Sequence, residues 1–150
     1  MTDERGQIFT KGVNAIKEGN TLLALSIFQK LVDSEPTPVI NSYYAYCIAK
    51  ERGLIRNAIS ICKEALEKEP ENPDIYLNLG RIYILSKDMP EAIKTLREGL
   101  SKGKNEFVIV ELNKLGTRRK PILPFLPRKN PLNKYLGLIA SRLFKKGTKT

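Results

Sequence analysis

Apolar side chains recur along the first two thirds of the chain with the spacing of amphipathic helices. The clearest stretch follows Pro73, which suits the first turn of a helix because its missing backbone N–H is harmless there. Residues at i, i+3, i+4 and i+7 then share one helical face, namely Tyr76, Leu79, Gly80 and Tyr83. A helix that is apolar on one side needs a partner to cover that side.

A second helix is predicted directly downstream, over about 89–100. Asp88 is a suitable N-cap, since its side chain can accept a hydrogen bond from a free backbone N–H of the first turn. The apolar face of this helix consists of Ala92, Ile93 and Leu96. Gly80 would weaken the first helix by about 1 kcal/mol, a cost that is tolerable where a second helix crosses closely. The pattern therefore predicts a helix–turn–helix unit.

The chain contains three copies of this unit with a period of 34 residues, in the windows 5–38, 39–72 and 73–106. The eighth position is glycine or tyrosine, the twentieth is always alanine, and the twenty-fourth is apolar. In window order these positions are Gly12, Tyr46 and Gly80, then Ala24, Ala58 and Ala92, then Phe28, Cys62 and Leu96. A fixed period of this length is typical of stacked helical repeats, because one unit cannot bury its apolar face alone.

The pattern Tyr76-x2-Leu79-Gly80-x2-Tyr83, followed by Ala92-x3-Leu96, resembles the tetratricopeptide repeat (TPR) family. The resemblance covers about residues 5–106. It implies an all-α fold, in which three TPR helix pairs form a right-handed α-α superhelix. The chain departs from the family pattern at three places: Lys11 stands at a usual leucine, Ser42 at a usual large aromatic residue, and Lys104 at the closing proline.

A capping helix is predicted over 106–115, which would cover the open face of the last repeat, as terminal repeats require. The β-branched run 107–110 also allows a strand, although a helical array offers no sheet for it to join. Residues 1–116 are thus predicted to form the repeat array, and 117–150 a separate tail.

The resemblance also implies a concave surface lined by the fifth, ninth and twelfth positions of each window. These positions are Phe9, Val13, Ile16, Tyr43, Cys47, Lys50, Leu77, Arg81 and Ile84. Most of them are apolar, and surplus apolar surface marks a binding site. Asn78 stands where family members often bind a ligand backbone. We expect this groove to bind a peptide or protein segment. The alternatives are a groove covered by the chain's own tail and a dimer interface.

One TPR subclass binds acidic C-terminal peptides through a two-carboxylate clamp of Lys, Asn and Arg. The clamp positions correspond here to Phe9, Val13, Tyr44, Asp74 and Asn78, and none of these matches. The sequence therefore excludes this clamp.

The formal net charge of +10 lies entirely in residues 117–150, which contain ten Lys or Arg and no acid. Prolines interrupt the first part of this tail, so a Pro-rich extended segment is predicted there. An amphipathic helix is predicted over 131–146. The basic residues that we expect to contact an anionic membrane or nucleic acid are Arg118, Arg119, Lys120, Arg128, Lys129, Lys134, Arg142, Lys145 and Lys146. A solvated tail, or one more packed helix, is the alternative.

The chain contains no histidine, which removes the usual general base and the commonest metal ligand. No Gly-rich phosphate loop follows a predicted strand. We therefore expect no enzyme, cofactor or metal site, and instead a non-catalytic adaptor or assembly factor. Cys47 and Cys62 lie on apolar helical faces and give no disulfide framework, which favours a reducing cytoplasm. No apolar run reaches the roughly 18 residues of a membrane span.

Overall fold

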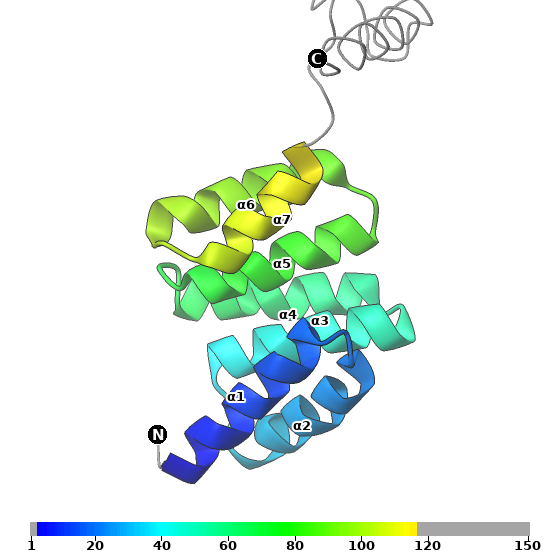
Figure 1. The fold of residues 1–150 in the computed structure, drawn as a ribbon, viewed down its shortest axis with the longest axis vertical. Coiled ribbons are helices and arrows are strands. Elements are labelled where there is room, and N and C mark those ends of the chain that lie inside the picture. Colours follow the sequence, from blue (N-terminus) through cyan, green and yellow to red (C-terminus); the bar gives the residue numbers. More distant parts are fainter. Residues whose placement is uncertain (1–2, 117–150) are drawn as a thin grey trace, which may run out of the picture. The chain divides into compact units, whose positions relative to one another are not determined.

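The computed structural model describes residues 3–116, which are entirely helical apart from their connections (Figure 1). The helices are α1 (Asp3–Lys17), α2 (Thr21–Ser34), α3 (Pro38–Arg52), α4 (Ile55–Lys68), α5 (Pro73–Leu85), α6 (Met89–Lys102) and α7 (Glu106–Gly116). The predicted all-α repeat fold is confirmed. The Pro-rich segment and the helix predicted over 131–146 lie outside the described residues. Within 3–116, no helix is both long enough and apolar enough to span a bilayer.

The helices pack as three successive antiparallel pairs, α1 with α2, α3 with α4, and α5 with α6. The second helix of one pair also packs on the first helix of the next, α2 on α3 and α4 on α5. Figure 1 shows these pairs following one another along the long axis of the array. Each pair corresponds to one 34-residue window, so neighbouring units cover the apolar faces that a single unit leaves open.

Side chains at the helix ends explain where the helices begin and stop. Asp88 caps α6 as predicted, since its Oδ1 accepts a hydrogen bond from the Glu91 backbone N–H at 3.3 Å. Asn72 caps α5 in the same way, and Pro73 follows in the first turn. Gly53 ends α3 in the left-handed region with φ of 68°, a conformation that glycine adopts without steric cost.

The close crossing predicted at Gly80 is present between α5 and α6. A Cβ atom at Gly80 would lie 2.6 Å from the side chain of Leu96, which is fully buried. The equivalent Gly12 of α1 faces Phe28 of α2, and a Cβ there would lie 2.8 Å from the Phe28 ring. The eighth and twenty-fourth positions of the window therefore meet in both pairs, so the predicted register is confirmed.

An aromatic cluster holds α1 away from α3. The backbones of α3 and α5 pack closely, whereas those of α1 and α3 do not. The space between them contains Phe9, Phe28 and Tyr43. Phe28 stacks on Tyr43 with ring centroids 5.1 Å apart, and Phe9 meets both rings edge-on, at 5.8 and 5.3 Å respectively. These bulky rings make α1 stand out from the layer formed by α3 and α5.

The predicted capping segment is a helix, α7, so the strand alternative is wrong. Val108 is fully buried and packs in one cluster with Leu77 of α5 and Leu96 of α6. Leu112 and Leu115 extend the same face of α7. This face covers the apolar end of the third pair, as a capping helix should.

Candidate functional site

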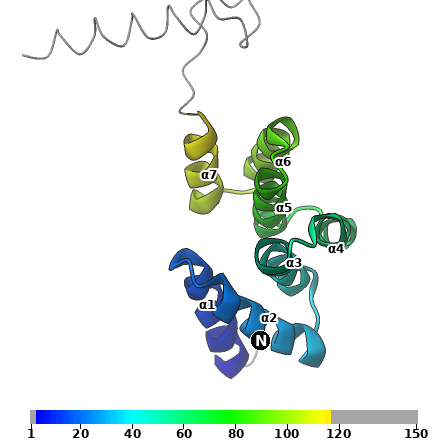
Figure 2. The same cartoon turned by 90° about the vertical axis from the view of Figure 1, so that its right-hand side faces the viewer.

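The first helices of the pairs, together with α7, form one concave face. Figure 2 shows α1 and α7 projecting on the same side of α3 and α5, so α3 and α5 form the floor and α1 and α7 the two walls. The walls meet over part of the floor, where Lys17 Nζ of α1 lies 4.6 Å from the ring centroid of Phe107 of α7. Beneath this contact, only a gap of about 10 Å³ remains above Tyr43 and Leu77.

The ten predicted groove residues differ widely in their exposure. Phe9, Val13, Ile16, Arg81 and Ile84 are half-buried, and Lys50 is exposed. Tyr43, Cys47 and Leu77 were expected to present an open apolar surface and Asn78 to bind a ligand backbone, but all four are at most 4% exposed. This burial corrects the expectation of a continuously open groove, because α1 and α7 cover the floor above Tyr43 and Leu77.

Asn78 has a structural partner inside the protein. Its Nδ2 donates a hydrogen bond to Ser42 Oγ at 3.0 Å, and both side chains are fully buried. Ser42 Oγ in turn donates to the backbone carbonyl of Val39 at 2.7 Å. The small side chain at position 42, which departs from the family pattern, leaves room for this amide. Asn78 thus joins the second pair to the third, and it is not accessible to a ligand.

A pocket of about 360 Å³ remains open beside the meeting point of the walls, at the N-terminal ends of α5 and α7. Its walls are partly apolar and its rim carries charged and amide side chains. The lining residues are Phe9, Thr10, Val13, Asn14, Lys17, Tyr43, Asp74, Lys104, Asn105, Glu106 and Phe107. Apolar walls with a few polar groups are typical of binding pockets of this size.

A chain of hydrogen bonds fixes the inner end of this pocket. Asp74 Oδ1 accepts a hydrogen bond from Asn105 Nδ2 at 2.6 Å, and the Tyr43 hydroxyl also donates to the Asp74 carboxylate. Burial raises the pKa of Asp74 and of Tyr43 above their usual values, an effect that the two hydrogen bonds to the carboxylate partly offset for Asp74. Asn105 Oδ1 accepts from the backbone N–H groups of Phe107 and Val108. The start of α7 is therefore tied to α5 and α3.

Arg81 lies in the middle of the groove, where α7 neutralises it. Its Nε donates to Glu111 Oε1 at 3.1 Å, and both side chains are 14% exposed. The Arg81 guanidinium also lies over the Tyr46 ring, 5.5 Å from its centroid. Burial raises the pKa of the Cys47 thiol, which also lies on α3, to about 12. The positive charge of Arg81 is therefore balanced by partners within the protein.

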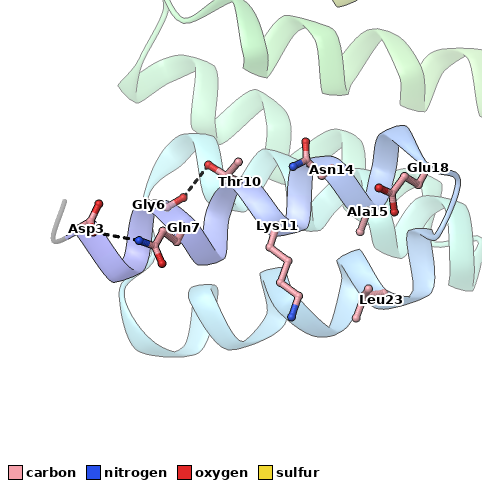
Figure 3. A pocket seen from close by; sticks show the side chains of 9 residues that line it. All are labelled: Asp3, Gly6, Gln7, Thr10, Lys11, Asn14, Ala15, Glu18 and Leu23. Carbon is pink, nitrogen blue, oxygen red and sulfur yellow. Dashed lines mark hydrogen bonds between the residues drawn. The ribbon is translucent and has the colours of Figure 1, made fainter.

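A larger hollow of about 780 Å³ runs along the outer side of α1 (Figure 3). Most of its lining residues carry polar side chains, with Gly6, Ala15 and Leu23 as the exceptions. Two of its polar side chains already bond within α1, since Gln7 Nε2 donates to Asp3 Oδ2 at 3.0 Å and Thr10 Oγ1 to the carbonyl of Gly6 at 2.8 Å. The pocket on the concave face combines apolar walls with converging polar groups, so it is the better candidate site.

Sequence reasoning missed eight residues of that pocket: Thr10, Asn14, Lys17, Asp74, Lys104, Asn105, Glu106 and Phe107. They come together only because α7 turns back toward α1, and no local pattern signals that turn. The basic residues predicted to contact an anionic partner, from Arg118 to Lys146, lie outside the described residues, and their role stays a prediction.

Comparison with known proteins gives the same repeat type. The tetratricopeptide repeat family model matches residues 49–107. The TPR repeat-containing protein YpiA of Bacillus subtilis (strain 168) is 31% identical over 78 residues, which are 51% of this chain and 18% of that protein. The chain thus aligns with only a small part of that relative.

Solved structures share the arrangement of the helices. The first TPR of Spaghetti (RPAP3), bound to the HSP90 peptide SRMEEVD, has a TM-score of 0.54 at 21% identity and covers 77% of this chain and 92% of its own. The Sgt2 TPR domain from Aspergillus fumigatus has a TM-score of 0.53 at 15% identity and covers 85% of this chain and 91% of its own. At such identities the likeness concerns the fold alone.

Proposed function

Because the chain belongs to the tetratricopeptide repeat family, we propose that it is a non-catalytic interaction module that binds a peptide or protein segment on its concave face. Repeat arrays of this kind use their concave surfaces for binding. The adaptor or assembly role stays a prediction, as does the cytoplasmic location, which was expected from the two free cysteines.

The observation that carries this proposal is the pocket between α1 and α7. Phe9, Val13 and Phe107 provide apolar area for a large ligand side chain. Asn14 and Lys104 lie at the exposed rim, where they can bond to the backbone or a polar side chain of the ligand. An extended segment that inserts one apolar side chain between the walls is the ligand that fits best.

Peptides that are selected from a displayed random library for binding to the full chain should bind in this pocket. We expect Val13→Asp to weaken the selected peptides at least about tenfold, because an apolar ligand group would then face a carboxylate. Isothermal titration of the synthetic peptides measures the effect.

The matched control for this experiment is Leu22→Asp. Leu22 is 66% exposed at the start of α2 and does not line the pocket, so the same charge change there should leave affinity unaltered. The peptide SRMEEVD should not bind, because the clamp positions of this chain carry no matching residues. Selected peptides that bind Val13→Asp as tightly as the natural chain would contradict the proposed site.

The charge distribution favours a second candidate function, a peripheral anchor. Residues 1–116 contain equal numbers of basic and acidic residues, while 117–150 add ten positive charges and no negative one. A segment of this kind is attracted to anionic lipids and to nucleic acid phosphates.

Truncation at residue 116 tests the anchor. The full chain should bind vesicles that contain phosphatidylserine, or double-stranded DNA, with an affinity that falls steeply as salt increases. The truncated chain should lose this binding, because its remaining charges are balanced. Co-sedimentation and fluorescence anisotropy at two salt concentrations measure it, and circular dichroism confirms that the array stays folded. Salt-sensitive binding that survives truncation would move the anionic site onto the repeats.

A further inference from the structure

We infer that α7 is a gate over the concave face, which opens at the connection 103–105 while α1 to α6 stay folded. The gate would regulate the groove described above, so its purpose rests on the proposed function. Its movement, however, is a property of the array and can be measured without any ligand.

The attachment of α7 differs from that of the other helices. The backbones of α1 to α6 approach one another closely within and between pairs, whereas the backbone of α7 does not come comparably near any of them. One fully buried side chain, Val108, anchors the helix, with Leu112 and Leu115 partly buried beside it. Local opening is expected where few apolar contacts hold a segment.

Besides the hydrogen bond from Asn105 to Asp74 at the hinge itself, two polar contacts keep α7 closed over the floor. Lys17 of α1 lies over the ring of Phe107, which remains 38% exposed, and Arg81 of α5 pairs with Glu111. Contacts of these types can break without leaving a core cavity, since water can solvate each charged partner in the open state. The Lys17 contact joins α7 to α1, the opposite wall of the groove, and the Arg81 pair joins α7 to α5 in the floor.

Opening of α7 has a built-in reporter in Cys47. This thiol is fully buried on α3, and the ring of the neighbouring Tyr46 lies beneath the Arg81 guanidinium, 5.5 Å from the ring centroid. Arg81 pairs with Glu111 of α7, so we expect release of this pair to loosen the floor around Cys47 and to expose the thiol. Cys62 is also fully buried, but it lies on α4 with its Sγ 3.9 Å from the Ser42 carbonyl, away from α7. Cys62 reports on unfolding of the core.

Alkylation of the full chain with iodoacetamide under native conditions tests the gate. Trypsin places the two thiols in separate peptides, 31–50 and 57–63, so mass spectrometry follows each of them. We expect Cys47 to react at least about tenfold faster than Cys62, because local opening is less costly than global unfolding. Phe107→Ala and Glu111→Gln should each accelerate Cys47 by about threefold or more and leave Cys62 unchanged.

Val110→Ala is the matched control, since Val110 lies on the same helix, is 46% exposed and takes no part in either contact. It should leave the rate at Cys47 unaltered. Equal reactivity of the two thiols in the natural chain would overturn the gate, as would a Cys47 rate that neither substitution changes. A confirmed gate without peptide binding would refute only the proposed function, and peptide binding with an immobile α7 would refute only the gate.

Discussion

Replacing Gly80 by leucine should lower the free energy of unfolding by about 3 kcal/mol, at the upper end of the usual cost of overpacking. Even a Cβ atom would lie 2.6 Å from Leu96 Cγ and Cδ2, and the longer side chain must occupy space that Leu96 already fills. Leu96 cannot turn away, because it is fully buried among α5, α6 and α7. Urea denaturation followed by circular dichroism measures the change.

Gly6 offers a matched control in α1, where a Cβ atom would meet nothing within 4 Å. Gly6→Leu should stabilise the chain slightly, by about 0.5 kcal/mol, because leucine favours the helical state over glycine. The same substitution is therefore expected to act with opposite sign at the two positions. If both variants unfold at the same urea concentration as the natural chain, α5 and α6 do not cross at Gly80.

The helix pairs could be predicted from the sequence because every window encodes them independently. Periodic apolar positions define each helix, and the contact of Gly12 with Phe28 recurs as that of Gly80 with Leu96. Such contacts lie within one window, so a repeated pattern is enough to infer them. The capping helix was predictable for a related reason, since the third pair leaves an apolar end that must be covered.

The burial of the groove floor could not be predicted from the sequence, because it depends on α1 and α7, which come from opposite ends of the array. The contact of Lys17 with Phe107 and the hydrogen bond from Asn105 to Asp74 arise only when α7 is placed over α5. No spacing in the sequence specifies that placement. The burial of Tyr43 follows from this placement together with its ring contacts to Phe9 and Phe28.

The roles of Ser42, a departure from the repeat pattern, and of Asn78, an expected ligand contact, are also visible only in three dimensions. Ser42 stood at a usual large aromatic position, and Asn78 was expected to bind a ligand backbone. The structure pairs them in one buried hydrogen bond of 3.0 Å. A small hydroxyl residue and a buried amide thus compensate each other across two windows, which a comparison of single positions cannot reveal.

Replacing Phe28 by alanine should remove about 4 kcal/mol of stability, as truncation of a fully buried aromatic side chain usually does. Phe28 has no exposed surface, stacks on Tyr43, meets Phe9 edge-on and fills the space above Gly12. Its loss leaves a cavity where α1, α2 and α3 converge. Because the backbones of α1 and α3 do not touch closely, α1 should also become the first helix to exchange its amide protons.

Phe107→Ala is the matched control for this truncation, since it removes the same side chain at a 38% exposed position on α7. This truncation should lower the free energy of unfolding by about 1 kcal/mol or less, because the side chain is already partly in solvent and water can solvate its charged partner Lys17 instead. Chemical denaturation of both variants gives the comparison, and hydrogen exchange locates the weakened helix. Equal costs at the two positions would mean that the cluster of Phe9, Phe28 and Tyr43 does not hold α1 in place. Other contacts of α1 would then have to fix its position along the groove.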